Sequence, residues 1–455
     1  MEVKKYDSYK DSGNGWLGEI PEHWEFKRMK DVLNFGTGLS ITKANLKNEG
    51  IPCVNYGEIH SKYGVNLDTR IHKLKCVDEK YIEKSSKALI RKGDFVFADT
   101  SEDVEGAGNF THLRSDEEVF AGYHTVTAKP KHRLCSTFFA FEFDSLNFRT
   151  QIRQSIKGVK VFSVTQSILK NTKVWMPPIE EQTQIANYLD QKTTQIDTLI
   201  SNKEKLIELL KEEQTAIINQ AVTKGLDPNV PMKDSGIEWL GEIPEHWEVL
   251  SFRFCIDVLT DYTANGSFAS LAKNVNYLDV GYSRLVRLTD LRVDLKNDGL
   301  FVDENAHNFL KKSELYGGEM LIANVGAYAG LVKIMPHLEG KHTLGPNMFL
   351  LRLNQNTDFF YEQLNAPFCA EQLKMMAISS AQPKLNKDNM RQLKVVKPPL
   401  EEQEVLVEKI KSETGRIDGL ASKIGEEIDL LKEYKTALIS EVVTGKVDVR
   451  DIKLN

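Results

Sequence analysis

A fifteen-residue segment occurs twice in this chain and limits its architecture more than any other feature. Residues 11–25 read DSGNGWLGEIPEHWE, and residues 234–248 read DSGIEWLGEIPEHWE. Only Asn14 and Gly15 differ from their counterparts, Ile237 and Glu238. The offset of 223 residues is about half of the 455-residue chain. A repeat of this size indicates a tandem duplication of a whole domain with its linker, not a solenoid.

A second pair of matching segments lies near the far end of each repeat. Residues 177–182 read PPIEEQ and residues 398–403 read PPLEEQ. Between the matching segments the halves diverge, and only a faint likeness survives, between Lys92–Ala98 and Gly317–Ala323. We call the matching segments the frame, and residues 26–175 and 249–397 the variable regions. A shared frame suggests one shared partner or architecture, and different variable regions suggest two different ligands of the same kind.

The composition is that of an ordinary folded protein. Charged residues make up 27% and hydrophobic residues 41% of the chain, which is long enough for two globular domains. No apolar run approaches the roughly 18 residues of a membrane span, and the first residues form no secretory signal. The five cysteines are scattered, which fits reduced thiols and a cytoplasmic location. No CxxC pair and no histidine spacing suggests a bound metal.

Charge is divided unevenly between the frame and the variable regions. The first variable region holds 24 Lys and Arg against 17 Asp and Glu, and the second holds 17 against 15. The whole chain has a net charge of −6, so the frame is strongly acidic. Basic variable regions in an acidic chain hint at contact with nucleic acid, although the second is only slightly positive.

Each Pro-Pro segment is predicted to open a long helix. From residue 180 to about residue 223 there is no Pro or Gly, and apolar residues recur in alternating steps of four and three. That spacing is a heptad seam, and about forty residues far exceeds the mean globular helix of about 11–12. We therefore favour a coiled coil between the two helices over two ordinary core helices. The predicted seam consists of Ile185, Leu189, Ile196, Leu199, Leu206, Leu210 and Ile217 in the first helix and Leu406, Ile410, Ile417, Leu420, Ile424, Leu431 and Leu438 in the second.

Both helices carry start and stop signals. The Glu-Glu pairs at 180–181 and 401–402 fall in the first turns, where carboxylates stabilise the helix dipole, and this role explains them without catalysis. The first helix is predicted to end at Lys224–Gly225. In the second, Gly415, Gly419 and Gly425 suggest a kink or a close approach of another segment.

The variable regions are predicted to be mixed α/β domains with irregular loops. Short strand-like runs stand between Gly, Asn and Asp residues, and a helix-like stretch follows them in each region. The strand-like runs are Phe95–Ala98, His124–Ala128, Met320–Ala323 and Met348–Leu351, and the helix-like stretches are Leu146–Ile156 and Phe359–Met376.

In combination, the frame motifs resemble those of the type I restriction–modification specificity subunit. They are IPEHWE opening each unit, PPIEEQ and PPLEEQ opening each long helix, and TKGLDPNVPMKDSGIEWLGEIPEHWE after the first helix. The run from Gly93 to Phe97 is similar to a glycine–aspartate strand of that family. The resemblance covers essentially the whole chain. It implies an α/β (α+β) fold in which two target-recognition domains are separated by two long antiparallel coiled-coil helices in a circular, pseudo-twofold arrangement.

The resemblance also sets the expected domain boundaries. Residues 1–25 would be the N-terminal part of the frame, residues 26–175 the first target-recognition domain, and residues 176–232 the central helix and linker. Residues 233–397 would form the second target-recognition domain and residues 398–455 the C-terminal helix.

The function implied by the resemblance is sequence-specific binding of double-stranded DNA. Each target-recognition domain would read one half of an asymmetric bipartite site. The helices would set the spacer and dock two methyltransferase subunits, and restriction subunits could join the complex. The chain itself would be non-catalytic, without a cofactor, a metal or a membrane contact.

Two alternatives remain open from the residues alone. The first is a DNA methyltransferase or nuclease acting by itself, but no GxxxxGK[ST] phosphate loop is present. The run from Asn365 to Phe368 falls short of an Asn-Pro-Pro-aromatic motif, and the run from Phe35 to Gly38 is a poor cofactor-binding glycine turn. The second alternative is a coiled-coil scaffold that binds only protein, which the basic variable regions disfavour.

Candidate DNA contacts are polar and basic loop residues at corresponding places in the repeats. Base edges are read chiefly by Arg, Lys, Asn and Gln, and phosphates by Lys, Arg and small polar residues. The candidates are Asn55, Tyr56, Lys62, Tyr63 and Lys160 in the first region and Arg284, Arg287, Thr289, Lys384 and Asn386 in the second. Trp24 and Trp247 are expected to be packing anchors where each domain joins its helix, not stacking platforms.

The repeat also predicts where the two ends of the chain meet. Residues 444–448 correspond to residues 223–227, and residues 9–11 correspond to residues 232–234. The chain therefore ends where its own middle linker begins and starts where that linker ends. We expect the two ends to lie close together beside the first variable region.

Overall fold

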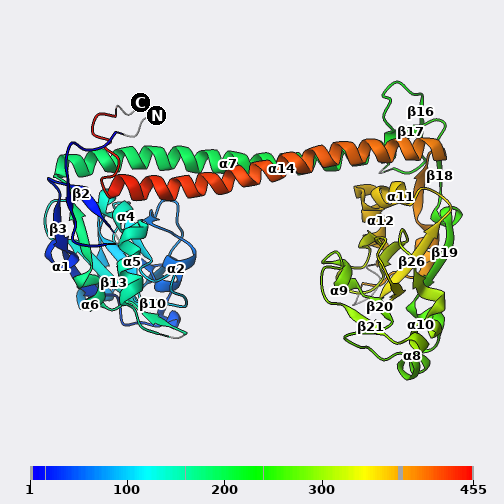
Figure 1. Ribbon diagram of the computed structural model, residues 1–455, viewed down its shortest axis with the longest axis horizontal. Coiled ribbons are helices and arrows are strands. Elements are labelled where there is room, and N and C mark those ends of the chain that lie inside the picture. Colours follow the sequence, from blue (N-terminus) through cyan, green and yellow to red (C-terminus); the bar gives the residue numbers. More distant parts are fainter. Residues whose placement is uncertain (1–3, 16, 159, 239, 378–382, 453–455) are drawn as a thin grey trace. The chain divides into compact units, whose positions relative to one another are not determined.

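The computed structural model describes residues 4–15, 17–158, 160–238, 240–377 and 383–452. The chain divides into two compact units (Figure 1). Unit 1 takes the residues up to 204 and those from 425 onward, and unit 2 takes residues 205–424. Each unit holds one variable region together with part of both long helices.

The variable region of unit 1 is built on two sheets. The first has the order β4-β13-β9-β11-β6, and the second has the order β7-β5-β12-β8. The strands are β4 (Leu33–Thr37), β5 (Ile51–Val54), β6 (Asn66–Leu67), β7 (Lys75–Val77), β8 (Leu89–Ile90), β9 (Phe95–Ala98), β11 (Phe110–Leu113), β12 (Val119–Ala121) and β13 (Thr125–Pro130). Helices accompany them: α1 (Met29–Val32), α2 (Tyr56–Ser61), α3 (Tyr81–Lys84), α4 (Ser136–Asp144), α5 (Leu146–Ser155) and α6 (Gln166–Asn171). Strand β9 is buried along its whole length, as its unbroken apolar sequence requires.

Unit 2 repeats this plan. One sheet has the order β19-β26-β23-β24 and the other the order β21-β20-β25-β22. The strands are β19 (Ile256–Asp261), β20 (Ser283–Val286), β21 (Leu300–Val302), β22 (Glu314–Leu315), β23 (Met320–Ala323), β24 (Val332–Ile334), β25 (Lys341–Leu344) and β26 (Met348–Leu353). The helices are α8 (Phe268–Asn274), α9 (Leu288–Leu291), α10 (Glu304–Phe309), α11 (Thr357–Asn365), α12 (Pro367–Ala377) and α13 (Lys387–Gln392). In each second sheet a parallel pair is followed by the same backbone bond, Gly122 N–H to Val54 and Gly345 N–H to Val286, at 2.7 Å in both.

Frame strands join each variable region to its helix. The hairpins β1 (Tyr9–Asp11)–β2 (Glu19–Pro21) and β16 (Met232–Asp234)–β17 (Glu242–Pro244) correspond to one another. So do the antiparallel pairs β3 (Glu25–Arg28)–β15 (Lys173–Met176) and β18 (Glu248–Ser251)–β27 (Lys394–Lys397). The last strand of each pair runs into the Pro-Pro segment that opens the long helix.

The two long helices are α7 (Ile179–Lys224) and α14 (Leu400–Val443), and they lie side by side and antiparallel within each unit (Figure 1). In unit 1, Asp197 pairs with Lys435, and Lys203 pairs with Glu427. In unit 2, Glu213 pairs with Arg416, and the side chain of Gln214 donates to Asp418. Helix α7 ends at Lys224 as predicted, and the left-handed Gly225 (φ +75°) follows it.

The predicted heptad seam is wrong in the middle of the helices. Leu199 and Leu206 are each 44% exposed and Leu420 is 39% exposed. Their neighbours Ile200 and Ile207 are less exposed than they are and take the inward positions. A straight helix turns once per 3.6 residues, so a strict 3.5-residue pattern drifts off the contact line within a few turns. Near the ends the prediction holds, because Ile185, Leu189, Ile196, Leu210, Leu406, Ile410, Ile417 and Leu438 are buried.

Two further helix expectations need correction. A Cβ added at Gly415, Gly419 or Gly425 would meet nothing within 4 Å, so these glycines mark no close approach inside an unbroken helix. The predicted helix Phe359–Met376 is two helices, α11 and α12, separated at Ala366. Pro367 causes this break, since the residue before a proline is pushed out of the helical region.

The predicted strands at Phe95–Ala98 and Met320–Ala323 are confirmed, and the predicted helix Leu146–Ile156 is α5. The predicted strand His124–Ala128 begins one residue later, at Thr125. All five cysteines are free thiols. None of the helices in the described part of the chain has the length and apolar character that crossing a membrane requires.

Candidate nucleic-acid interface

The repeated IPEHWE and PPxEEQ motifs meet in space at a buried carboxylate. In unit 1 the Glu181 carboxylate accepts hydrogen bonds from the Trp24 indole at 3.0 Å and from the Tyr6 hydroxyl at 2.6 Å, and His23 Nε2 lies 2.7 Å away. Burial and the neighbouring Glu181 carboxylate raise the pKa of the Tyr6 hydroxyl. In the other repeat, Trp247 and His246 reach Glu402 at 3.0 and 2.8 Å.

The helix-dipole explanation for these acids was therefore incomplete. Glu181 and Glu402 bind the entry segment of each domain to the first turn of its helix, whereas Glu180 and Glu401 are exposed. Trp24 and Trp247 are fully buried at this junction, which confirms them as packing anchors.

The glutamine of each PPxEEQ motif fixes the same junction from the other side. The Gln182 amide donates to the Pro177 carbonyl at 2.8 Å and accepts from Cys135 N–H at 3.1 Å. Gln403 donates to the Pro398 carbonyl at 2.9 Å and accepts from Asn356 N–H at 3.1 Å. Every polar residue that the motif shares between repeats thus has the same type of partner in both.

Segments near the two ends of the chain contact each other in unit 1, as the repeat predicted. Asp448 N–H donates to the Lys4 carbonyl at 2.8 Å, and the Lys4 ammonium pairs with Asp448 and Asp451. The Arg450 guanidinium lies 4.7 Å from the centre of the Tyr6 ring. These contacts stand where the covalent linker 226–231 stands in the other repeat.

Three connections converge at one end of each variable region. In unit 1, Asp99 N–H donates to the His124 carbonyl at 3.1 Å, and the Asp99 carbonyl accepts from Val164 N–H at 2.8 Å. In unit 2, Asn324 N–H donates to the Asn347 carbonyl at 3.1 Å, and the Asn324 carbonyl accepts from Leu385 N–H at 2.8 Å. We call these matching places the loop junctions.

The side chains at the two loop junctions differ although the backbone is the same. In unit 1 the His124 ring lies 3.2 Å from the Asp99 carboxylate, which also accepts from Thr100 at 2.6 Å. In unit 2 asparagine replaces both residues, and the buried Oδ1 of Asn324 has no hydrogen-bond partner among the described residues. Matching backbones with different polar groups are what two readers of different sequences require.

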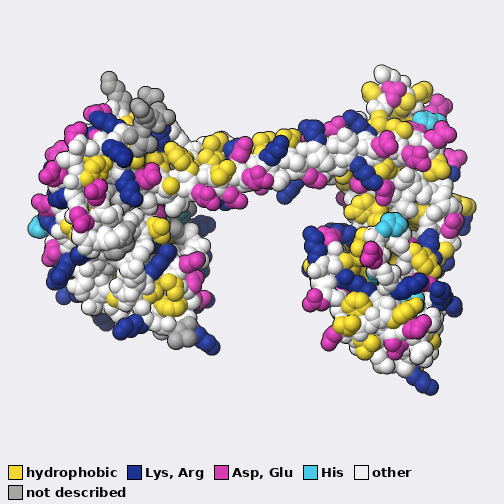
Figure 2. Space-filling model, in the orientation of Figure 1, with side chains coloured by type: hydrophobic (Ala, Val, Ile, Leu, Met, Phe, Trp, Pro, Cys, Tyr) yellow, Lys and Arg dark blue, Asp and Glu magenta, His cyan; other side chains and the backbone are white. Residues whose placement is uncertain are grey.

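The unit 2 loop junction opens on a pocket of about 340 Å³. Its polar lining includes Asn324, Asn347, Lys384, Asn386 and Lys387. Lys384 is exposed, and Lys387 pairs with Asp261 at 3.1 Å. Figure 2 shows Lys and Arg side chains on the visible face of this unit interspersed with acidic and hydrophobic ones, not gathered in a single patch.

Some of the residues predicted to contact DNA have structural roles instead. Asn55 is buried, and its backbone and side-chain N–H groups donate to Glu58 at the start of α2. Tyr63 is buried, and its hydroxyl donates to the Lys73 carbonyl at 2.7 Å. Asn386 caps α13 by accepting from Asn389 N–H at 2.7 Å. Polarity alone marked these residues, and their bonds lie within the domain.

The arginines of unit 2 are partly engaged. Arg287 starts α9 and pairs with the buried Asp290 at 2.8 Å. Arg284 is half-buried and donates to the carbonyl and side chain of Asn297 at 3.0 Å. Each guanidinium would have to share its donors with a base or a phosphate.

The remaining predicted residues stand at the surface. Lys62, Lys160, Thr289 and Lys384 are exposed. Tyr56 is half-buried, with its ring 5.7 Å from that of Tyr123 and 5.3 Å from that of His124. Tyr56 and Lys384 thus lie at the loop junctions of their units.

The sequence prediction missed Asp99, His124, Asn324 and Asn347. A signal was present, since Gly122-Tyr123-His124 and Gly345-Pro346-Asn347 precede corresponding strands with the same spacing. A Cβ at Gly122 would lie 1.9 Å from the Asn55 side chain, and a Cβ at Gly345 would lie 2.8 Å from the Val286 carbonyl. Both glycines are thus required by close backbone approach.

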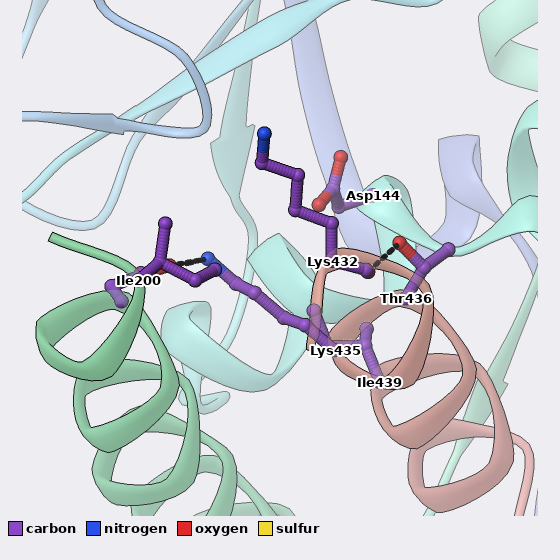
Figure 3. A pocket seen from close by; sticks show the side chains of 7 residues that line it. Asp144, Ile200, Lys432, Lys435, Thr436 and Ile439 are labelled. Atoms are coloured by element: carbon purple, nitrogen blue, oxygen red, sulfur yellow. Dashed lines mark hydrogen bonds and ion pairs between the residues drawn. The ribbon is translucent and has the colours of Figure 1, made fainter. Parts of the chain in front are cut away.

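Another pocket, of about 350 Å³, lies between α7, α14 and the end of α4 in unit 1 (Figure 3). Lys435 reaches across it to the Asp197 carboxylate at 2.6 and 2.7 Å, and the Thr436 hydroxyl donates to the Lys432 carbonyl at 3.0 Å. These polar contacts join the helices, so we assign the pocket to helix packing. The described part of the chain holds no group of three or more His, Cys, Asp or Glu side chains placed to hold a metal ion.

Comparisons with known proteins agree with this arrangement. The family model described as "Type I restriction modification DNA specificity domain" matches residues 21–209 and 276–429. The putative type I restriction enzyme MjaX specificity subunit of Methanocaldococcus jannaschii is 24% identical over 442 residues, covering 95% of this chain and 96% of that protein. The EcoKI specificity subunit of Escherichia coli is 21% identical over 451 residues, covering 94% and 90%.

Solved structures share the fold. A chain from work on complex assembly and conformational transition of the type I R-M system matches with a TM-score of 0.67 at 15% identity, covering 93% of this chain and 98% of that one. The HsdS subunit from Thermoanaerobacter tengcongensis matches with a TM-score of 0.57 at 16% identity, covering 94% and 98%. With its duplicated frame, its two long helices and a family match to both halves, the chain belongs to the type I restriction–modification DNA specificity family.

Proposed function

We propose that this protein is the sequence-reading subunit of a type I restriction–modification complex. Each variable region would read one half of an asymmetric bipartite site in double-stranded DNA. The observation that carries the proposal is the pair of loop junctions, where one backbone arrangement presents Asp99 and His124 in one domain and Asn324 and Asn347 in the other. Family membership supports DNA as the ligand.

The domain boundaries follow from the frame. We propose target-recognition domains at residues 26–175 and 233–397, joined by the helical segments 176–232 and 398–455. A circular, pseudo-twofold arrangement is supported by the junctions that both repeats share. One repeat continues through the covalent linker, and the other through the contact between Lys4 and Asp448. In this arrangement the helices would fix the length of the unread spacer.

The partners would be two methyltransferase subunits, with restriction subunits as optional additions. Large apolar side chains left exposed on the long helices support a docking surface there: Leu199, Leu206, Leu209, Leu420 and Leu430. We infer that methyl transfer and cleavage belong to these partners and that the chain is non-catalytic alone.

Co-expression with the modification subunits of its own system tests the proposal. Modified adenines mapped across the host genome should spell one bipartite sequence, and purified complex should shift a duplex carrying that sequence in a gel. Methyl transfer by the purified chain alone, or modified adenines without a common sequence, would overturn it.

A further inference from the structure

We propose that His124 and Asn347 are specificity-determining residues, each reading the edge of one base in the half-site of its own domain. This inference rests on the function proposed above. The two residues occupy the same place, directly before β13 and β26. Both have left-handed backbones, with φ of +54° and +66°, which glycine adopts at no cost. A side chain kept at such a position, in both repeats, points to a role for the side chain itself.

The surrounding backbone holds each residue in place. The carbonyl of His124 accepts from Asp99 N–H, and that of Asn347 accepts from Asn324 N–H, at 3.1 Å in both units. Both side chains belong to exposed residues at the convergence of three connections. A fixed main chain with one variable, outward side chain is the geometry that base reading needs, because discrimination depends on precise donor and acceptor placement.

The chemistry of Asn347 selects adenine. A carboxamide accepts from the N6 amino group and donates to N7 of adenine, which is the preferred bidentate pairing of asparagine with a base edge. Lys384, exposed at the same pocket, is placed to neutralise a phosphate next to that base.

The chemistry of His124 selects a base with an exocyclic amino group. The Asp99 carboxylate, 3.2 Å from His124 Nδ1, only accepts hydrogen bonds, so Nδ1 carries the proton. In the neutral ring Nε2 is then an acceptor, suited to the amino group of cytosine or adenine. Asp99 is the positioning residue for this ring.

The experiment uses the full-length chain in complex with its modification subunits and maps methylated sites. The wild-type complex must first yield a bipartite site, and failure at this step sinks the proposed function whatever Asn347 does. Asn347→Gly keeps the left-handed backbone and removes the side chain. It should lower discrimination at one base pair of the unit 2 half-site by about tenfold or more and leave the other half unchanged.

A second variant and a graft keep the test decisive if the glycine variant assembles poorly. Asn347→Asp preserves size and tolerance of the left-handed region but only accepts, so it should shift the preference from adenine toward cytosine. His124→Asn should change one base of the other half-site to adenine.

Asp294→Gly is the matched control. Asp294 also has a left-handed backbone in unit 2, at φ +50°, but it pairs with Lys333 away from the loop junction. This variant should methylate the wild-type site. If the Asn347 variants also methylate an unchanged site at the wild-type level, Asn347 is only a turn residue and the inference is wrong, while the proposed function stands.

Discussion

The indole N–H of Trp24 donates to the carboxylate of Glu181 across 157 residues of chain, at 3.0 Å, and Trp247 and Glu402 repeat this bond at the same distance. Each pair ties the entry of a domain to the first turn of a long helix. The duplication has preserved this contact while the loop junctions changed. Domain attachment and base reading are thus carried by different residues, and they can be perturbed separately.

Removing the attachment carboxylate should destabilise unit 1 without changing the site that is read. Glu181→Ala leaves the buried Trp24 and Tyr6 donors without their acceptor, so we expect a loss of about 2–4 kcal/mol in the free energy of unfolding. Urea unfolding followed by tryptophan fluorescence measures it. Glu180→Ala, at the exposed neighbour in the same helical turn, is the control and should change stability by less than about 0.5 kcal/mol. Equal effects from the two variants would contradict the attachment role.

A buried acid in unit 1 should make stability depend on pH. Glu142 is fully buried and accepts from Trp175 N–H at 2.8 Å, and its Oε2 has no partner among the described residues. In unit 2 the equivalent Gln363 accepts from Val396 N–H at 3.0 Å and donates to the Val396 carbonyl at 2.8 Å. Burial raises the pKa of the Glu142 carboxyl well above its ordinary value, so the protonated acid takes the place of the amide.

The sign of the effect follows from linkage. Because the folded pKa is raised, the stability gained from protonated Glu142 is complete below about pH 4.5 and is lost as pH rises toward the folded pKa. Glu142→Gln should match the wild type near pH 4.5 and gain on it by up to about 1.4 kcal/mol per pH unit above. Gln363→Glu should introduce the same pH dependence into unit 2. Parallel stability–pH curves for Glu142→Gln and the wild type would show that Glu142 is not protonated in the folded protein.

The spacing between the half-sites should follow the length of the helices. Seven residues inserted after Lys203 in α7, with seven inserted at the facing Glu427 in α14, add about 10 Å of helix. At about 3.4 Å per base pair, the unread spacer should lengthen by up to roughly three base pairs, and both half-sites should stay the same. Methylation mapping of the lengthened complex checks this. An altered half-site with an unchanged spacer would show that the helices do not measure the distance.

Sequence reasoning was strongest where local rules decide the structure. The end of α7 at Lys224, strand β9 and helix α5 follow from glycine placement, apolar runs and helix periodicity, which act over a few residues. The heptad seam failed at Leu199 and Leu206 because the choice between adjacent leucines and isoleucines depends on the small difference between 3.5 and 3.6 residues per turn.

The site was harder to predict because its residues meet only after folding. Polarity selected Asn55 and Tyr63, which bond inside the domain, and it passed over His124, which looked like part of a strand. The dipole explanation of Glu181 was reasonable locally, but the partners of this carboxylate lie more than 150 residues away in the sequence. Comparing the repeats position by position would have shown the shared Gly-x-His and Gly-x-Asn spacing.

The most direct test of the account replaces residues 26–175 with a copy of residues 249–397 and leaves both long helices intact. Partner docking should survive, because the Glu181 and Gln182 junction and the helices are unchanged. Methylation mapping of the hybrid complex should then return an interrupted palindrome built from the second half-site in inverted orientation, as twofold protein symmetry requires of its DNA. A direct repeat would contradict the antiparallel arrangement, and the original asymmetric site would show that the variable regions are not the readers.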